Sequence, residues 1–188
     1  MPTTAAPSGA RVAATLLYTA RMDAGPLLGE IGRRLQEVGL EAVLIGNAAA
    51  ALQGAPVTTV DFDFLFRKTP RNLRKLKALA RRLRATILRP YYPASDMYRL
   101  VRDDDGLQLD FMATIHGLRS YEGVRDRAVP IEVAGSVLRV AALADIIRSK
   151  RAANRPRDRA VLDVLETALE EAPQPPRPPR RPRSRKPS

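Results

Sequence analysis

The chain has 188 residues, 45% of them hydrophobic, and a formal net charge of +12. This length favours one domain with a core of its own. The absence of cysteine excludes disulfides, thiolate catalysis and cysteine-ligated zinc, and a single histidine, His116, excludes a multi-histidine metal site. The apolar run over residues 12–20 is too short to cross a bilayer, so we expect a cytoplasmic protein without membrane contact.

The first helix is predicted over residues 26–38, where apolar residues recur near helical spacing. Residues 1–21 precede it and are expected to form a flexible arm. A buried strand is predicted over residues 42–45, followed by Gly46 and a short helix over residues 47–54. This order presents backbone N–H groups at a helix N-terminus, where a phosphate can bind, and a glycine lets the phosphate approach closely because it lacks a Cβ.

The strand predicted over residues 60–66 organises the rest of the chain. Its alternation places Asp61 and Asp63 on one face and aromatic side chains on the other. Two adjacent carboxylates repel each other unless a cation joins them. Magnesium suits this position, because it binds one or two carboxylates and leaves its other positions to water and substrate phosphates.

A basic amphipathic helix is predicted over residues 67–84, which contain nine basic residues and no acidic one. Its charged face is either a solvated surface or a track for RNA and substrate phosphates. The tail, residues 172–188, has six basic and no acidic residues among its prolines, and we expect it to be disordered. It is either a solubilising tail or a non-specific nucleic-acid contact.

Residues 97–101 and 107–112 are predicted to form two strands joined by a turn with an Asp-Asp-Gly sequence, which is typical of hairpins. In the second strand, Asp110 lies on the face opposite the hydrophobic side chains. A buried, unpaired carboxylate is costly, so Asp110 needs a cation. If this strand lies beside the strand of Asp61 and Asp63, three carboxylates converge.

The remaining chain is predicted to form two strands and two helices, over residues 129–133, 137–140, 142–153 and 156–171. Lys150 and Asp158 lie on the apolar stripes of these two helices. They form a mutual ion pair, or Lys150 faces a bound anion and Asp158 positions it. In the third interpretation Lys150 reaches water while Asp158 interacts with the helix dipole.

The order of the chemically interesting residues resembles the signature of the nucleotidyltransferase superfamily, which has the DNA polymerase beta-like fold. The resemblance rests on the segments Gly46-Asn47, Thr59-Val60-Asp61-Phe62-Asp63 and Leu109-Asp110-Phe111. One position differs, because Asn47 stands where the family usually has serine or glycine. An asparagine can donate a hydrogen bond to a phosphate oxygen or cap the helix, but its bulk can also crowd the triphosphate.

The C-terminal segment, residues 140–159, is similar to the ending of bacterial abortive-infection toxin-type nucleotidyltransferases. Together the two resemblances cover residues 24–170. They imply an α+β nucleotidyltransferase fold with a short mixed sheet that carries an Asp triad, flanking helices and a small C-terminal helical part. The domain would span residues 22–171, divided into a catalytic part over residues 22–140 and a helical pair over residues 141–171.

The resemblance also implies an activity, the transfer of a nucleoside monophosphate from an NTP to an acceptor hydroxyl. The catalytic residues would be Asp61, Asp63 and Asp110, and they would hold two Mg²⁺ ions. The nucleotide would be bound by a second group of residues, Gly46, Asn47, Lys150 and Asp158.

The basic helix and tail favour RNA as the acceptor, for example a tRNA 3′ end, and a protein hydroxyl remains an alternative. The resemblance suggests the toxin of a toxin–antitoxin system, with a cognate antitoxin as its partner. The second hypothesis is a catalytically weak RNA-binding or antitoxin-like protein on the same fold. A third, an antibiotic-modifying enzyme, predicts an acidic pocket for a cationic drug, and the basic composition argues against it.

Overall fold

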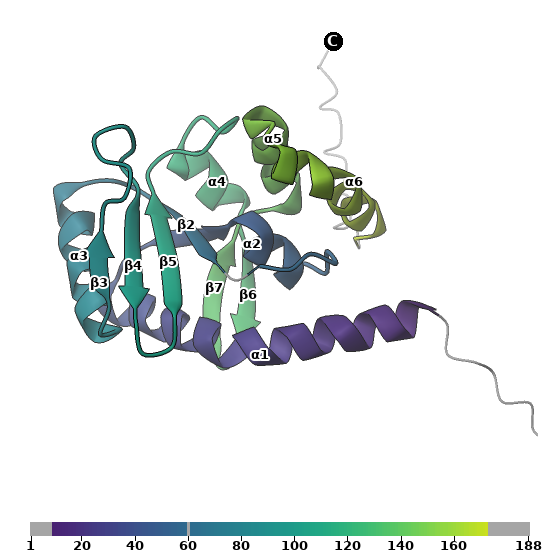
Figure 1. Ribbon diagram of the computed structural model, residues 1–188, viewed down its shortest axis with the longest axis horizontal. Helices are drawn as coiled ribbons and strands as arrows, with labels where there is room; N and C mark the ends of the chain where they lie inside the picture. Colours follow the sequence, from purple (N-terminus) through teal and green to yellow (C-terminus); the bar gives the residue numbers. More distant parts are fainter. Residues whose placement is uncertain (1–8, 60, 173–188) are drawn as a thin grey trace, which may run out of the picture.

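The computed structural model describes residues 9–59 and 61–172, with side chains described from residue 24 onward. A mixed seven-stranded sheet lies at the centre of the described chain, with helices packed around it (Figure 1). The strands are β1 (Ala42–Ile45), β2 (Phe62–Phe66), β3 (Thr86–Leu88), β4 (Tyr98–Arg102), β5 (Leu107–Met112), β6 (Val129–Val133) and β7 (Ser136–Val140). The helices are α1 (Gly9–Val38), α2 (Gly46–Leu52), α3 (Pro70–Arg82), α4 (Tyr121–Arg127), α5 (Leu143–Ala153) and α6 (Pro156–Glu171). The α+β fold class is confirmed.

The N-terminal helix differs from the prediction. Helix α1 begins at Gly9, not near residue 26, so Pro26 lies inside the helix and does not open it. Residues 9–21, expected in a flexible arm, have a helical backbone, and residues 1–8 lie outside the described residues. Proline is common in the first turn of a helix, and this preference moved the predicted start too far along the chain.

Two elements are absent from the sequence prediction. Strand β3 has three residues and helix α4 has seven. Both are too short for a hydrophobic period to emerge. The predicted tail lies almost wholly in residues 173–188, outside the described residues.

The strand order is β3-β4-β5-β2-β1-β7-β6. Strand β2 runs parallel to β5, and β1 runs parallel to β7, while the other neighbours are antiparallel. The β2–β5 register places Asp63 opposite Asp110, and the β4–β5 register places Arg99 opposite the same Asp110. Residues directly opposite each other point to the same face.

One face of the sheet holds the main core. Phe64 and Phe111 stack with their ring centroids 5.1 Å apart, and Phe66 packs edge-on against Phe111. Helices α1 and α3 contribute buried aliphatic side chains to this core, among them Ile31 and Leu79.

The opposite face is covered unevenly. Helix α2 packs against β1 and β2, and α5 packs against α2. In the described part of the chain no helix is drawn over the front of β3, β4 and β5 (Figure 1). A site at the β2–β5 boundary therefore has helix α2 on its β1 side and no described helix over its β4 side.

No helix within residues 9–59 and 61–172 combines the length and the hydrophobicity that crossing a bilayer requires.

The aromatic core gives a test of this packing. Replacing Phe64, which is fully buried, with alanine is expected to lower the free energy of unfolding by about 3–5 kcal/mol, because it removes apolar contacts and leaves a cavity. Urea denaturation monitored by circular dichroism measures the change. The matched substitution Val164→Ala, at an exposed position of α6, should change it by less than about 0.5 kcal/mol. Equal effects of the two substitutions would contradict this description of the core.

Candidate active site

Three carboxylates gather at the boundary between β2 and β5. Asp63 and Asp110 are directly opposite each other in the parallel β2–β5 pair, and Asp61 immediately precedes β2. The strand pairing on which the expected convergence depended is thus confirmed. Asp110 is buried, Asp63 is partly exposed and Asp61 is exposed.

Asp63 is held in an environment that disfavours its charge. Burial, followed by the neighbouring charges of Asp110 and Asp61, raises the pKa of Asp63 to about 6. Lys150 and Arg157 act on the same carboxyl group in the opposite direction but do not compensate fully. A cation near Asp63 would therefore relieve a repulsion that the described side chains leave in place.

Gly46 lies directly against this carboxyl group. It has a φ of +70°, and a Cβ at this position would lie 2.6 Å from Oδ2 of Asp63. Both the backbone conformation and the close contact require glycine. Gly46, the first residue of α2, therefore lies against the carboxyl group of Asp63. Phosphate binding at this position stays a prediction.

Asp110 already has a cationic partner. Arg99 donates from Nε to Oδ1 at 2.8 Å and from NH2 to Oδ2 at 2.7 Å, a bidentate ion pair across the β4–β5 hairpin. A cation was predicted for Asp110 from the sequence, but Arg99 was not identified as that cation. In β4 the side chain of Arg99 points to the face opposite that of its neighbours Tyr98 and Leu100. The turn between β4 and β5 fixes the register that places Arg99 opposite Asp110.

The carboxylate oxygens of the three aspartates differ in how free they are to bind Mg²⁺. No group of three or more His, Cys, Asp or Glu residues within the described ranges is arranged to hold a metal ion. Both oxygens of Asp110 are bound by Arg99, and Oδ1 of Asp61 accepts a hydrogen bond from Gln108 at 3.2 Å. Two carboxylates suffice for Mg²⁺, which takes its other ligands from water and phosphate. Asp61 and Asp63 therefore fit such an ion.

Lys150 and Asp158 form an ion pair, one of the three interpretations left open by the sequence, with Nζ and Oδ1 3.4 Å apart. A second cation, which the sequence interpretation missed, is Arg155, whose Nε lies 2.6 Å from Oδ2 of the same Asp158. Burial raises the pKa of Asp158, but the hydrogen bond from Arg155 and the charges of both cations outweigh this effect and hold the pKa below its usual range. Lys150 also lowers the pKa of Asp63, so the ammonium group that Asp158 holds is within electrostatic range of that carboxyl group.

Asn47 is not a helix cap. The N-cap position of α2 is Ile45, and Asn47 lies within the helix. Its Nδ2 donates to the carbonyl of Thr58 at 3.3 Å, and its Oδ1 is buried without a hydrogen-bond partner among the described atoms. Asn47 thereby connects α2 to the segment that leads into β2.

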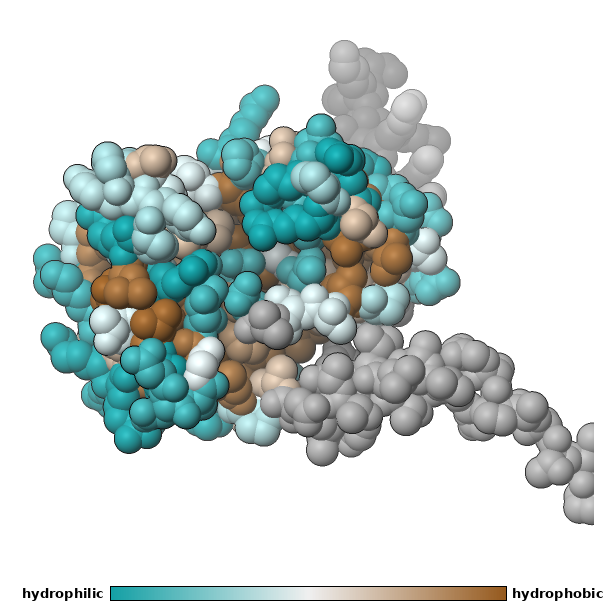
Figure 2. Space-filling model, viewed as in Figure 1, coloured by the Kyte–Doolittle hydropathy of each residue, from teal (hydrophilic) through white to brown (hydrophobic). Residues whose placement is uncertain are grey.

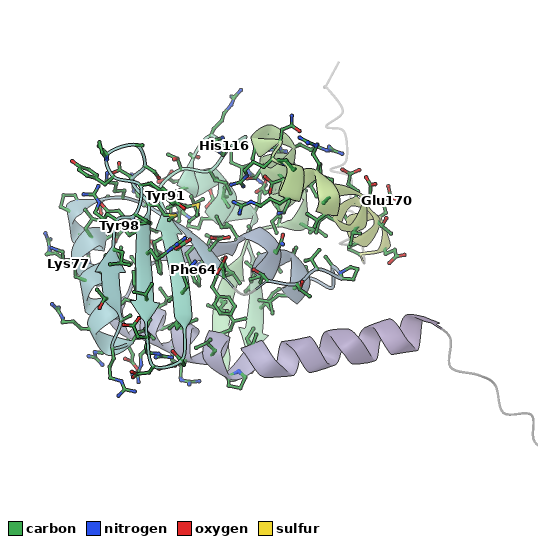
Figure 3. The ribbon with its side chains drawn as sticks, in the orientation of Figure 1. Phe64, Lys77, Tyr91, Tyr98, His116 and Glu170 are labelled. Atoms are coloured by element: carbon green, nitrogen blue, oxygen red, sulfur yellow. The ribbon has the colours of Figure 1, made fainter. Side chains whose placement is uncertain are left out.

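The basic helix α3 lies at the β3 edge of the sheet, against β3 and α1. Figure 3 shows Lys77 on its outer side, directed away from the sheet. Some cations of this segment are paired, for example Arg67 with Glu122 and Arg82 with Glu37, whereas Arg74 and Lys77 have no ion-pair partner in the described part of the chain. The charge of this helix is therefore separate from the carboxylates.

A hollow of about 700 Å³ lies between α1, α3 and β7. Its lining includes Arg67, Arg71 and Lys75 but none of the three aspartates. The hollow is therefore not the candidate active site.

The pKa of Asp63 gives a prediction about stability. The carboxyl group is protonated in both folded and unfolded chains below pH 3.8, whereas above pH 6 it is ionised in both, at a cost in the folded protein. Asp63→Asn should therefore raise the free energy of unfolding by up to about 3 kcal/mol at neutral pH, with the gain growing from pH 4 to pH 6. Urea denaturation in EDTA over this range measures it. An equal gain at every pH, or the same profile for the exposed control Asp163→Asn, would contradict the prediction.

The fold is similar to that of known nucleotidyltransferases. The crystal structure of ANT(2″)-Ia in complex with adenylyl-2″-tobramycin matches with a TM-score of 0.55 and 17% identity, over 78% of this chain and 90% of that chain. The solution structure of the antibiotic-resistance factor ANT(2″)-Ia matches with a TM-score of 0.52 and 15% identity, over 79% of this chain and 90% of that one. At such identities the likeness shows the fold alone, and no curated protein sequence matches the chain. The model of the family described as "nucleotidyl transferase of unknown function (DUF2204)" matches residues 26–174, so this chain belongs to that nucleotidyltransferase family.

Proposed function

We propose that this enzyme transfers a nucleoside monophosphate from an NTP to an acceptor hydroxyl at the carboxylates of Asp61, Asp63 and Asp110. The observation that carries the proposal is the environment of Asp63, whose carboxyl group lies against Gly46 with its pKa raised to about 6. Perturbed carboxyl groups of this kind cluster at functional sites. A site that only bound anions would gain nothing from three carboxylates on one face.

Magnesium is the cofactor that fits this donor set. Asp61 and Asp63 would hold it, and Asp110 would join them at a second ion, as the resemblance implies. Bound Mg²⁺ lowers the pKa of an acceptor hydroxyl and stabilises negative charge that develops on the transferring phosphoryl group.

The remaining residues of the site bind and orient the nucleotide. Gly46 leaves room for the triphosphate beside the backbone, and Asn47 holds the start of α2 in place through Thr58. Lys150 carries the positive charge toward the phosphates, and Asp158 restrains its ammonium group at 3.4 Å. Arg157 also lowers the pKa of Asp63, so we assign it to the phosphates as well.

The acceptor in this proposal is RNA. The basic composition supports it, since a chain of net charge +12 attracts polyanions. The likeness to ANT(2″)-Ia suggests an aminoglycoside as the alternative acceptor, but the net charge of +12 argues against a polycation. A cytoplasmic location agrees with the use of NTP and RNA.

A transfer assay tests the activity. The purified protein is incubated with Mg²⁺, each α-³²P-labelled NTP and total bacterial RNA, beside Asp61→Asn, Asp63→Asn and the exposed control Asp163→Asn. We expect label on RNA with the wild type and the control, and at least about a 100-fold loss for the two site variants, because metal binding contributes several kcal/mol to the transition state. Unchanged transfer by a folded Asp63→Asn variant would reject the assigned site.

The same activity provides a test of the toxin role, which rests on the resemblance of residues 140–159. We propose that induction of the wild-type chain in bacteria arrests growth, and that Asp63→Asn abolishes the arrest because it removes a catalytic carboxylate. Growth curves with matched protein levels measure the effect. Equal arrest by both proteins would exclude a toxin that acts through nucleotidyl transfer and would leave no reason to expect a cognate antitoxin.

A further inference from the structure

One row of residues crosses the sheet through the candidate active site. Leu88 in β3 is opposite Arg99 in β4, Arg99 is opposite Asp110 in β5, and Asp110 is opposite Asp63 in β2. Residues opposite each other point to one face, so this row leads from the carboxylates to the outer edge of the sheet. The β1 side of the row is covered by α2 and α5, which leaves the β4 side for an acceptor.

The row ends at a group of exposed apolar and aromatic residues. Leu88 is 44% exposed, Tyr91 is 55% exposed and Tyr92 is 62% exposed. Figure 2 shows hydrophobic residues on the surface over β3 and β4, bordered by hydrophilic ones. Exposed large hydrophobic side chains elsewhere lie apart from this group, on β6, β7 and α6. Solvent-exposed tyrosine side chains at the end of this row indicate a binding surface.

Charged residues hold the tyrosine segment in place. The guanidinium group of Arg89 lies 3.8 Å from the ring centroid of Tyr92 and 5.2 Å from that of Tyr98. Arg89 also donates to Asp96 at 3.0 Å, and Lys68 contacts the same carboxylate. The surface is therefore both aromatic and cationic, and its conformation is restrained before any ligand binds.

Tyr91 lies near the Arg99 position of the carboxylate row. The hydrogen bond that Arg99 donates to Asp110 is the largest effect that raises the pKa of Arg99, and Asp61 and the ionised form of Tyr91 act in the same direction. Tyr91 is thus close to Arg99. Figure 3 shows Tyr91 in the connection between β3 and β4, at the end of the sheet where β4 begins.

We propose that Tyr91 and Tyr92, together with Leu88, form a stacking platform for an unpaired base at the end of a single-stranded RNA acceptor. Aromatic side chains stack on any nucleobase, and neighbouring cations attract the phosphate backbone. Arg89 and Lys68 share one carboxylate, that of Asp96, so one positive charge beside the platform is not compensated by this pairing. This charge opposes a polycationic acceptor. As the acceptor site of the transfer reaction, the platform rests on the proposed function, but its binding of RNA can be measured without transfer.

The test measures RNA binding to the full chain in EDTA, without nucleotide. Fluorescence anisotropy of a short, labelled, single-stranded oligoribonucleotide is compared for the wild type, Tyr91→Ala, Tyr92→Ala and the two tyrosine-to-phenylalanine variants. Titration in the presence of duplex competitor suppresses contacts that only recognise the phosphate backbone. We expect each alanine variant to bind about 5- to 100-fold more weakly, and each phenylalanine variant to bind nearly as tightly as the wild type, because phenylalanine keeps the stacking surface.

Val137→Ala is the matched control, because Val137 is 51% exposed but lies on β7, away from the platform. It should leave RNA binding unchanged. Wild-type affinity in both alanine variants would overturn the proposal. Equal competition by duplex RNA and by single-stranded RNA would also overturn it. A third contrary result would be displacement of the labelled RNA by an aminoglycoside at a lower concentration than unlabelled RNA requires.

The outcomes separate this inference from the proposed function. Tyrosine-dependent RNA binding with no transfer of label would support the platform and count against the transfer reaction. Normal transfer with an unchanged KM for RNA in the alanine variants would support the reaction and reject the platform.

Discussion

Repulsion among carboxylates is the constraint on which the arrangement of the active-site end of the sheet depends. The parallel pairing of β2 with β5 places Asp63 directly beside Asp110, with Asp61 near both. Each carboxylate is compensated differently. Asp110 is neutralised by Arg99, and Asp61 accepts a hydrogen bond from Gln108, whereas Asp63 has only more distant cations. The uncompensated charge is thereby concentrated at the residue that Gly46 contacts.

The C-terminal helices contribute cations to the same region. The joint between α5 and α6 depends on Asn154, which adopts a left-handed conformation with a φ of 49°. Asparagine tolerates this conformation better than most residues. The sharp turn brings Arg155 and Asp158 back toward Lys150. The helical pair thus packs on α2 and also places the cations Lys150 and Arg157 near Asp63.

Much of this arrangement could be predicted from the sequence, because the informative signals are local. Alternation in the strand of Asp61 and Asp63, an isolated Asp110 and the order of these residues with Gly46 carried the family resemblance, and that resemblance implied the fold class. Pairing between strands was harder to predict. The ion pair between Arg99 and Asp110 follows from the hairpin register, which the turn sequence could have provided, since a symmetric pairing around the turn places these two residues opposite each other.

Other features could not be predicted, for physical reasons. The three residues of β3 form a strand only because β4 provides a neighbour for pairing, and no period exists over so short a length. By contrast, Arg155 stands three residues before Asp158, a spacing at which side chains of one helix meet, so this missed pair was open to prediction. The role of Asp63 depends on three-dimensional burial, which a pattern of alternating residues cannot quantify.

The bidentate contact between Arg99 and Asp110 has a consequence for ion binding. Since Arg99 donates to both oxygens of Asp110, any ion that binds this carboxylate must exchange with a guanidinium group already present. The affinity of Asp110 for a metal ion is therefore the attraction of the carboxylate for that ion minus its attraction for the guanidinium group of Arg99. A ligand phosphate that drew Arg99 away would raise that affinity without touching the ion, so occupancy at this carboxylate would respond to the arrival of an anionic substrate.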